Sequence, residues 1–116
     1  MSFIENPTVD QLSRYLDLAS RRQSLVSGNI ANIDTPGYQT RDVDFAAELQ
    51  RVLSGDNSML TEVNVRGLVS RPDGNNVNAD REGLLLAQTQ LQFQTGVELL
   101  RSQLQRLSVA INEGRP

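Results

Sequence analysis

Apolar residues recur at helical spacing near both ends of this chain, whereas the stretch between the ends has no such long period. The first run opens at Asn6-Pro7, where Pro7 suits a first helical position, or at Thr8, which can form a capping box with Gln11. Its members follow intervals of three and four residues: Val9, Leu12, Leu16, Ala19, Gln23, Val26, Ile30 and Ile33. This seven-residue period predicts a long N-terminal helix with a stripe that packs on another helix.

The end of this helix is marked by Pro36 and Gly37. Pro36 disfavours the helical conformation for Thr35, and Gly37 can adopt a positive φ at little cost. We therefore expect the helix to end within residues 32–34 and a defined turn to follow. Polar side chains that can bond the open backbone groups there are Asn29, Asn32, Asp34 and Thr35.

The second run predicts a helix that opens at Asn78 or Asp80 and closes at Gly114. Its row again alternates fours and threes: Ala79, Gly83, Leu86, Gln90, Phe93, Val97, Leu100, Leu104, Leu107 and Ile111. A helix of this extent is about 50 Å long at 1.5 Å per residue. We expect the rows near the two ends of the chain to pack against each other.

The middle of the chain predicts shorter elements. Asp42 or Asp44 can cap a helix over residues 45–53, whose apolar residues share one face. The alternating pattern of residues 59–65 suggests a short strand or extended segment, and residues 71–76 form a dense turn signal.

These patterns predict a mainly α fold in which long N- and C-terminal helices pair as a coiled-coil-like hairpin. With 116 residues the chain fits a single domain. Within it we distinguish an N-terminal core helix (1–34), a middle region of turn, short helix and loop or extended chain (35–78), and a C-terminal core helix (79–116).

Composition argues against catalysis and against nucleic-acid binding. The chain has no Cys and no His, its net charge is −3, and its basic residues are arginines scattered among acids. A nucleic-acid surface requires clustered positive charge. The carboxylates of Asp34, Asp42 and Asp44 are more simply explained as helix or turn caps than as catalytic or metal-binding groups. We expect no enzyme activity, cofactor, metal site, small-molecule substrate or nucleic-acid partner.

Several residues admit two interpretations from sequence alone. Tyr38 on its rigid turn can bury its ring against a partner or pack on its own helices. Arg21 and Arg22 can contact a phosphate or a neighbouring chain, or form ion pairs on the helix surface. Gly28 marks either a close backbone approach or a weak point in the helix.

The N-terminus has no basic region followed by an apolar core, and the longest apolar runs fall short of the roughly 18 residues of a membrane span. We therefore expect neither a Sec-type signal peptide nor a membrane anchor.

Residues 29–38, Asn-Ile-Ala-Asn-Ile-Asp-Thr-Pro-Gly-Tyr, resemble the signature shared by axial proteins of the bacterial flagellum, which include rod, hook and hook-junction subunits. Residues 41–45 directly after it, residues 72–78 before the last helix and the run over residues 98–111 are similar to the short proximal members of the basal-body rod protein family. The resemblance covers nearly the whole chain.

The resemblance implies a structural subunit that stacks through its terminal helices into a hollow tubular drive shaft. Such a tube crosses the periplasm, transmits torque and lets exported flagellar proteins pass through its lumen. Family members leave the cytoplasm through the flagellar type III apparatus without cleavage of a signal. The implied partners in the rod are further copies of the chain, the rod protein FlgC and the distal rod proteins. At the base of the rod they are the rod-base protein FliE, the export gate and the membrane ring.

For such a subunit we expect two sets of interface residues. The turn motif and the residues after it supply the first set: Asn29, Ala31, Asn32, Thr35, Pro36, Gly37, Tyr38, Asp44 and Phe45. The helix seams supply the second: Val9, Leu12, Leu16, Val26, Ile30, Leu86, Phe93, Val97, Leu100, Leu104, Leu107 and Ile111. We further expect the turn to direct Tyr38 and Phe45 outward, toward other subunits. The alternative is a small secreted or cytoplasmic helical-hairpin adaptor that binds one partner helix and forms no polymer.

Overall fold

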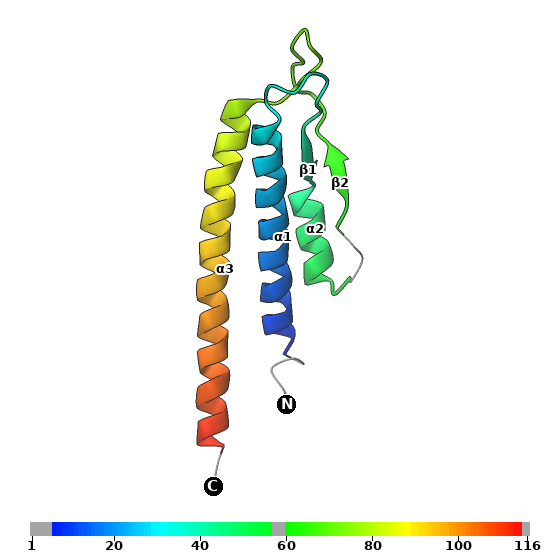
Figure 1. Ribbon diagram of the computed structural model, residues 1–116. Coiled ribbons are helices and arrows are strands. Elements are labelled where there is room, and N and C mark those ends of the chain that lie inside the picture. Colours follow the sequence, from blue (N-terminus) through cyan, green and yellow to red (C-terminus); the bar gives the residue numbers. More distant parts are fainter. Residues whose placement is uncertain (1–5, 57–59, 115–116) are drawn as a thin grey trace.

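The computed structural model describes residues 6–56 and 60–114 and has the shape of a long hairpin with a small flank. Its elements are α1 (Pro7–Ala31), β1 (Arg41–Val43), α2 (Phe45–Leu53), β2 (Glu62–Asn64) and α3 (Ala79–Glu113). Helices α1 and α3 run antiparallel side by side, and α2 with the two short strands lies against the other side of α1 (Figure 1). The mainly helical hairpin predicted from the sequence is thus confirmed.

The limits of α1 follow from its capping residues. Asn6 accepts a hydrogen bond from the Val9 N–H at 3.0 Å and Pro7 occupies the first turn, so the helix opens at Asn6-Pro7 and not at Thr8. The last helical residue is Ala31, Asn32 is the C-cap, and Gly37 takes a φ of 77° in the turn that follows. The predicted stop before Pro36 is confirmed, one residue before the expected range.

The short helix α2 has the predicted bounds. Of the two candidate caps, Asp44 accepts a bond from the Ala47 N–H at 3.2 Å, whereas Asp42 lies in β1 and serves another purpose. The last helix opens at Asn78, whose side chain accepts from the Arg81 N–H at 3.0 Å, and not at Asp80.

The predicted extended segment is only partly a strand. Within it, β2 covers Glu62–Asn64 and pairs antiparallel with β1, with Arg41 opposite Asn64. Residues 57–59, which include the start of the predicted segment, lie outside the described residues. The sequence did not predict β1, because three residues are too few for an alternating pattern to be detected.

Helix α3 presents a different row to α1 than the sequence predicted, and this corrects the expected seam. The α3 residues that become buried are Glu82, Leu85, Thr89 and Gly96. On the predicted row, by contrast, Phe93, Leu104 and Ile111 remain 38%, 40% and 55% exposed. The half-buried members of that row are Leu86, Val97, Leu100 and Leu107.

The reason for this change of face is that the buried polar residues of α3 find hydrogen-bond partners, while its glycine permits close contact. The Thr89 hydroxyl donates to the carbonyl oxygen of Leu85 within the same helix. A Cβ placed on Gly96 would lie only 2.6 Å from Leu16 Cδ2 and 3.1 Å from Tyr15 Cδ1. Side chains of α1 therefore fill the space that a larger residue at position 96 would need.

The apolar stripe predicted for α1 agrees better with the residues that are buried in the structure. Val9, Ala19 and Val26 belong to it and are buried, and Leu18 from the neighbouring row joins them. Leu12 and Leu16 are half-buried and Ile30 is 39% exposed. A Cβ on Gly28 would meet no atom within 4 Å, so Gly28 is a weak point of the helix and not a close approach.

None of the helices described here is long and apolar enough to cross a bilayer.

Candidate functional site

The two motifs that flank the hairpin, residues 29–38 and 72–78, meet at one end of the molecule, where α1 ends and α3 begins (Figure 1). The Gly37 N–H donates to the Asp73 carbonyl at 2.8 Å, and the Asn76 N–H donates to the Tyr38 carbonyl at 3.3 Å. Gly74, with a φ of 86°, packs against Gly37: a Cβ added to it would lie 3.4 Å from Gly37 Cα. Two stretches far apart in sequence therefore form one structural unit, which we call the head (residues 29–43 and 71–82).

Asn75 closes the end of α1 from the opposite motif. Its side chain is fully buried, and its amide donates to the carbonyls of Asn32 at 2.9 Å and Thr35 at 2.8 Å. Its side-chain oxygen accepts the Val77 N–H at 2.8 Å. The last carbonyls of a helix and its following turn lack partners within the helix. Asn75 supplies donors for two of them.

Asn76 holds the chain that leads from the turn into β1. Its side-chain oxygen accepts the buried Thr40 N–H at 2.7 Å, and its amide donates to Gln39 Oε1 at 3.0 Å. Asn75 and Asn76 therefore bond different parts of the chain between the end of α1 and the start of β1.

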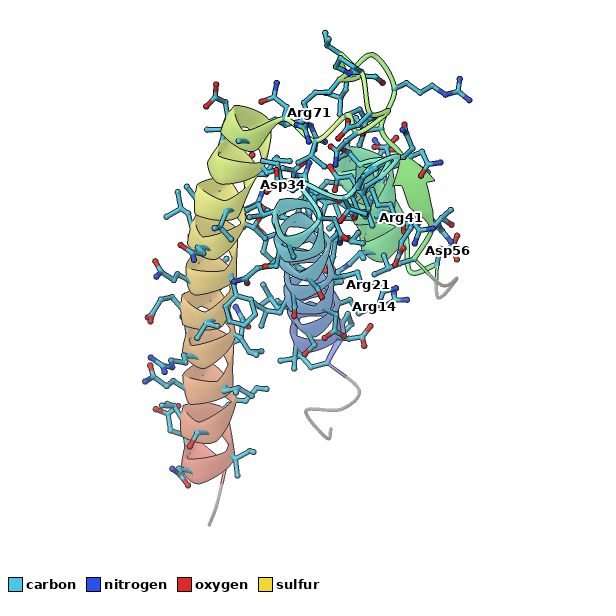
Figure 2. The ribbon with its side chains drawn as sticks, turned by 45° about the horizontal axis from the view of Figure 1, so that its top comes forward. Arg14, Arg21, Asp34, Arg41, Asp56 and Arg71 are labelled. Carbon is cyan, nitrogen blue, oxygen red and sulfur yellow. The ribbon has the colours of Figure 1, made fainter. Side chains whose placement is uncertain are left out.

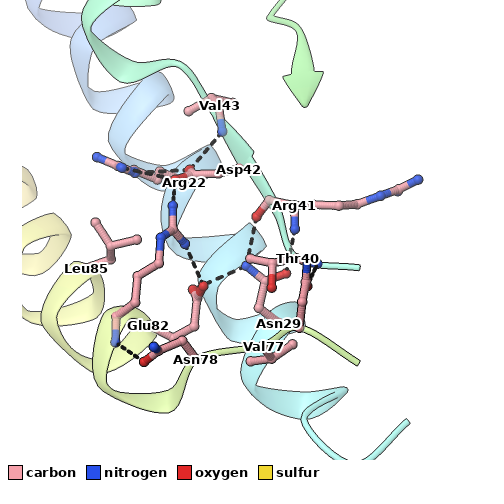
Figure 3. Close-up of polar contacts among 12 residues, drawn as sticks. Arg22, Asn29, Thr40, Arg41, Asp42, Val43, Val77, Asn78, Glu82 and Leu85 are labelled. Carbon is pink, nitrogen blue, oxygen red and sulfur yellow. Dashed lines mark hydrogen bonds and ion pairs between the residues drawn. The ribbon is translucent and has the colours of Figure 1, made fainter. Parts of the chain in front are cut away.

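Asn29 lies at the centre of the head and has no exposed surface. Its amide donates to the Arg41 carbonyl at 2.8 Å and to Glu82 Oε2 at 3.2 Å (Figure 3). Its oxygen accepts the Tyr38 hydroxyl at 2.9 Å and the Arg41 N–H at 3.1 Å. An asparagine side chain can donate two bonds and accept two, so its capacity is filled. It joins α1, the turn, β1 and α3.

A buried ionic cluster adjoins Asn29. The carboxylate of Asp42, 4% exposed, accepts two bonds of 3.1 Å from Arg22 and one of 2.8 Å from Arg81. Arg81 also bonds Glu82, which has no exposed surface, at 2.7 Å (Figure 3). Two carboxylates face two guanidinium groups, so the cluster is neutral and bonded throughout, which is the condition under which buried charge is tolerated. It ties α1 and β1 to the first turn of α3.

Two further arginines of α1, Arg14 and Arg21, also have acidic or carbonyl partners. Figure 2 shows Arg14 and Arg21 on the side of α1 that faces α2 and β2. Arg21 pairs with the Glu62 carboxylate, and Arg14 donates to the Asp56 carbonyl at 2.8 Å. The ion-pair interpretation of Arg21 and Arg22 is therefore confirmed.

The rings of Tyr38 and Phe45 do not both point outward, and this corrects the expectation that the turn directs them toward other subunits. Tyr38 is half-buried and its hydroxyl bonds Asn29. Phe45 packs edge-on against the Tyr15 ring at 6.2 Å between centroids, and the Arg22 guanidinium lies 5.4 Å from the Phe45 centroid. Both aromatic residues stabilise the contact between their own elements.

The motif residues expected at a subunit interface thus divide into two groups. Asn29 has no exposed surface with which to contact another chain. The Asn32 side chain donates to the Gly28 carbonyl and accepts the Thr35 hydroxyl. Exposed members are Ala31, Thr35, Pro36, Gly37 and Asp44, of which Asp44 caps α2. For the exposed residues an interface role stays a prediction.

Sequence reasoning did not identify Asp42, Glu82, Arg22 and Arg81 as a cluster. Each is an ordinary charged residue in its local context, and their partnership depends on the packing of three elements. The one available signal was the density of asparagines in both motifs, because such residues bond backbone groups in turns.

Within the described ranges, no group of three or more carboxylate residues lies close enough together to hold a metal ion. The buried carboxylates of Asp42 and Glu82 are engaged by arginine.

Comparison with known proteins identifies relatives over most of the chain. The family model "Flagella basal body rod protein" matches residues 16–39, which span the second half of α1 and the first motif of the head. The chain is 36% identical over 122 residues to "Flagellar basal body rod protein FlgB" of Salmonella typhimurium, with 85% of this chain and 88% of the relative covered. The proteins of the same name from Yersinia enterocolitica and Escherichia coli K12 are 33% and 31% identical, with 85% of this chain and 89% and 88% of the relatives covered.

Proposed function

The chain belongs to the FlgB family of flagellar basal body rod proteins, and from this we propose that it is a structural subunit of the proximal rod. In this role copies of the hairpin assemble through their terminal helices into a hollow tube in the periplasm. The tube transmits torque and carries exported flagellar proteins through its lumen. The subunit itself reaches its place through the flagellar export apparatus without loss of a signal peptide.

The observation that supports assembly most directly is the apolar surface of α3. Along this helix large side chains stay exposed in the single chain: Leu84, Leu91, Phe93, Leu99, Leu104, Val109 and Ile111, with exposed fractions of 38% to 69%. By helical spacing Phe93, Leu99, Leu104 and Ile111 lie beside the buried row, whereas Leu84, Leu91 and Val109 lie on the side of the helix turned away from it. A long helix with apolar flanks requires neighbours, and a rod subunit has them on several sides.

The proposal extends to the organisation of the chain and to its partners. Residues 1–34 and 79–116 serve as the core helices of the tube, and residues 35–78 form its outer part. The neighbours are other copies, FlgC and the distal rod proteins on one side, and FliE with the membrane ring and export gate on the other. The exposed motif residues Ala31, Thr35 and Pro36 are proposed to contact these neighbours.

The test is deletion of the gene in its native host. We expect the deletion strain to lose motility and the intact gene to restore it. We also expect purified basal bodies to contain several copies of the chain. A motile deletion strain, or absence of the chain from basal bodies, would exclude the rod role and favour a helical-hairpin adaptor.

A second test concerns the turn at Gly37. Its φ of 77° and its N–H bond to Asp73 hold the two motifs together, and a β-branched residue at this φ is strained by about 1–2 kcal/mol or more. We expect Gly37→Val to block rod assembly while expression is unchanged, as measured by motility and immunoblotting. Gly28→Ala, a helical glycine with open space around it, is the matched control and should support swimming.

A further inference from the structure

Helix α3 carries two rows of residues that fit a helical partner. The row that faces α1 in the structure, which we call the inner row, consists of the buried residues Glu82, Leu85, Thr89 and Gly96. A second and more apolar row, the side row, lies roughly 60° further round the helix at about 100° per residue. Its large apolar members are Leu86, Phe93, Val97, Leu100 and Leu104.

Apolar burial alone does not favour the inner row. Thr89 is 1% exposed, and its hydroxyl donates to the Leu85 carbonyl of its own helix. The Oε1 atom of Gln92, beside this row, is buried and accepts no hydrogen bond from any described residue. Phe93 and Leu104 of the side row meanwhile stay 38% and 40% exposed. Polar groups are thus buried while large apolar side chains face solvent, which is a local conflict between sequence and packing.

The head supplies the polar contacts that hold the inner row on α1. Glu82 Oε2 accepts the Asn29 amide at 3.2 Å (Figure 3), and the Arg81 guanidinium donates to Asp42 Oδ2 at 2.8 Å. These two contacts join the first turn of α3 to α1 and to β1. Glu82 has no exposed surface and Asp42 is 4% exposed, so a turn of α3 that breaks these contacts is costly.

Arg81 and the side row lie on opposite flanks of the inner row. Arg81 is about 70° from the centre of the inner row, on the flank where it bonds Asp42, and the side row is roughly 60° from that centre in the other direction. Bringing the side row onto α1 therefore carries Arg81 away from Asp42. The closed head and a buried side row exclude each other.

The close contact at Gly96 also favours the inner row, but it is less specific. It is made by Leu16 and by the Tyr15 ring, which fill the space beside the glycine. Apolar contacts are non-directional, so the same two side chains can pack on Val97 after a turn of α3. The bond between Arg81 and Asp42 has no such substitute, because it depends on the direction of the guanidinium group.

We propose that α3 has two rotational settings on α1 and that the head selects between them. With the head closed, the inner row faces α1, and Phe93 and Leu104 are open to solvent. With the head open, α3 turns by roughly 60° and covers the side row. Leu104 lies about 33 Å from Glu82 along the helix at 1.5 Å per residue, so a change at the head alters apolar surface far from it. The inference concerns the single chain and does not depend on the rod function.

Thiol labelling of the purified chain tests the inference, because the chain contains no cysteine. The head is opened by Arg81→Glu, which places a third carboxylate beside Asp42 and Glu82. An acidic residue is favourable in the first turn of a helix, so α3 itself stays helical. The reporters are Leu85→Cys on the inner row and Leu86→Cys on the side row, each prepared with and without Arg81→Glu.

We expect Arg81→Glu to raise the maleimide labelling rate of Leu85→Cys about threefold and to lower that of Leu86→Cys by a similar factor, because labelling follows thiol exposure. Opposite changes at two neighbouring positions distinguish a rotation of the helix from its loosening. Higher rates at both positions would show that the head variant only loosens α3. That result, or unchanged rates at both positions, would overturn the inference.

Disulfide formation within one chain gives an independent measurement. A Cβ at position 96 lies 2.6 Å from Leu16 Cδ2, so the pair Leu16→Cys/Gly96→Cys brings two thiols together when the head is closed. The pair Leu16→Cys/Val97→Cys does so after the rotation. We expect the ratio of the two disulfide yields to reverse when Arg81→Glu is added. A pair at positions 16 and 96 that dominates in both backgrounds would contradict the second setting.

Two control variants separate the ion pair from other effects of the substitution. Arg81→Lys keeps the positive charge at the head. Arg101→Glu makes the same change on the same helix, at a side chain that is 70% exposed. Both should leave the two labelling rates at the values of the parent. Circular dichroism checks that Arg81→Glu retains its helicity, and if it does not, Arg81→Gln, which removes the cation without adding a carboxylate, must give the same opposite changes.

Discussion

Four hydrogen bonds meet on the Asn29 side chain, and they determine how the first motif is used in the folded chain. A residue with two donors and two acceptor sites is needed there, because Arg41 offers both a carbonyl and an N–H, Glu82 offers an acceptor and Tyr38 offers a donor. An aspartate would lose the donors and a leucine would lose every bond. The residue acts within its own subunit.

Replacing Asn29 by leucine should therefore destabilise the chain by about 3 kcal/mol, since buried polar groups on three elements lose partners. Urea unfolding followed by circular dichroism measures this change. Asn112→Leu, at an exposed position of α3, is the matched control and should stay within about 0.5 kcal/mol of the parent. An Asn29→Leu chain as stable as the control would contradict the role given to this residue.

Tyr15 makes stability depend on alkaline pH. Burial raises the pKa of its phenol, so the folded state holds the proton more strongly than the unfolded chain does. The resulting stabilisation is complete below the unfolded pKa, about 10, and is lost as the pH rises through the folded pKa. With no Lys and no Cys in the chain, few other side chains titrate in this range.

We expect the urea midpoint to fall as the pH is raised above about 10, and to fall less in Tyr15→Phe, which has no proton to lose there. Parallel pH series on the two proteins measure the difference. The same slope in both would show that Tyr15 does not couple to folding.

At the scale of elements, the packing of α3 on α1 is decided by small and polar residues as much as by large apolar ones. Gly96 receives Leu16 and the Tyr15 ring, and Glu82 enters the ionic cluster. Once these residues face α1, the apolar row that includes Leu104 and Ile111 turns to the flank. The same rotation that completes the head leaves apolar side chains open for neighbours.

Gly96→Val should destabilise the hairpin by about 2 kcal/mol, because the added atoms meet Leu16 and Tyr15 in a filled space. Gly83→Val is the matched control on the same helix. A Cβ at Gly83 meets nothing within 4 Å, and valine has a higher helix propensity than glycine, so stability should hold or rise slightly. The melting temperatures of the two variants, measured by thermal unfolding, give the comparison. Equal melting temperatures would contradict the close contact at Gly96.

At the scale of the whole molecule, the hairpin is elongated. Its extents are 71 × 24 × 17 Å and its radius of gyration is 18.3 Å. A compact domain of this length would have a radius of gyration of about 13 Å. A chain this thin buries little apolar surface of its own, which agrees with a subunit that completes its burial in an assembly.

Small-angle scattering at low concentration should give a radius of gyration near the 18.3 Å of the extended hairpin. The value should rise with concentration if copies associate. A value close to that of a compact domain would mean that α3 folds back on the rest of the chain.

Much of this architecture was determined by the sequence alone. Pro36 and Gly37 end the first helix, the bounds of residues 45–53 were predicted correctly, and the paired long helices follow from the two seven-residue periods. These are local properties, because backbone restriction, capping and helical periodicity depend on residues within a few positions of each other.

Only the tertiary structure decided which faces meet and which motif residues stay accessible. Asp42 looked like a cap and is the centre of a buried ion cluster, and Phe45 looked like an outward ring and packs on Tyr15. The rotation of α3 about its axis depends on bonds between residues 29 and 82 and on the space at residue 96. Such terms join residues far apart in the chain, so no local pattern contains them.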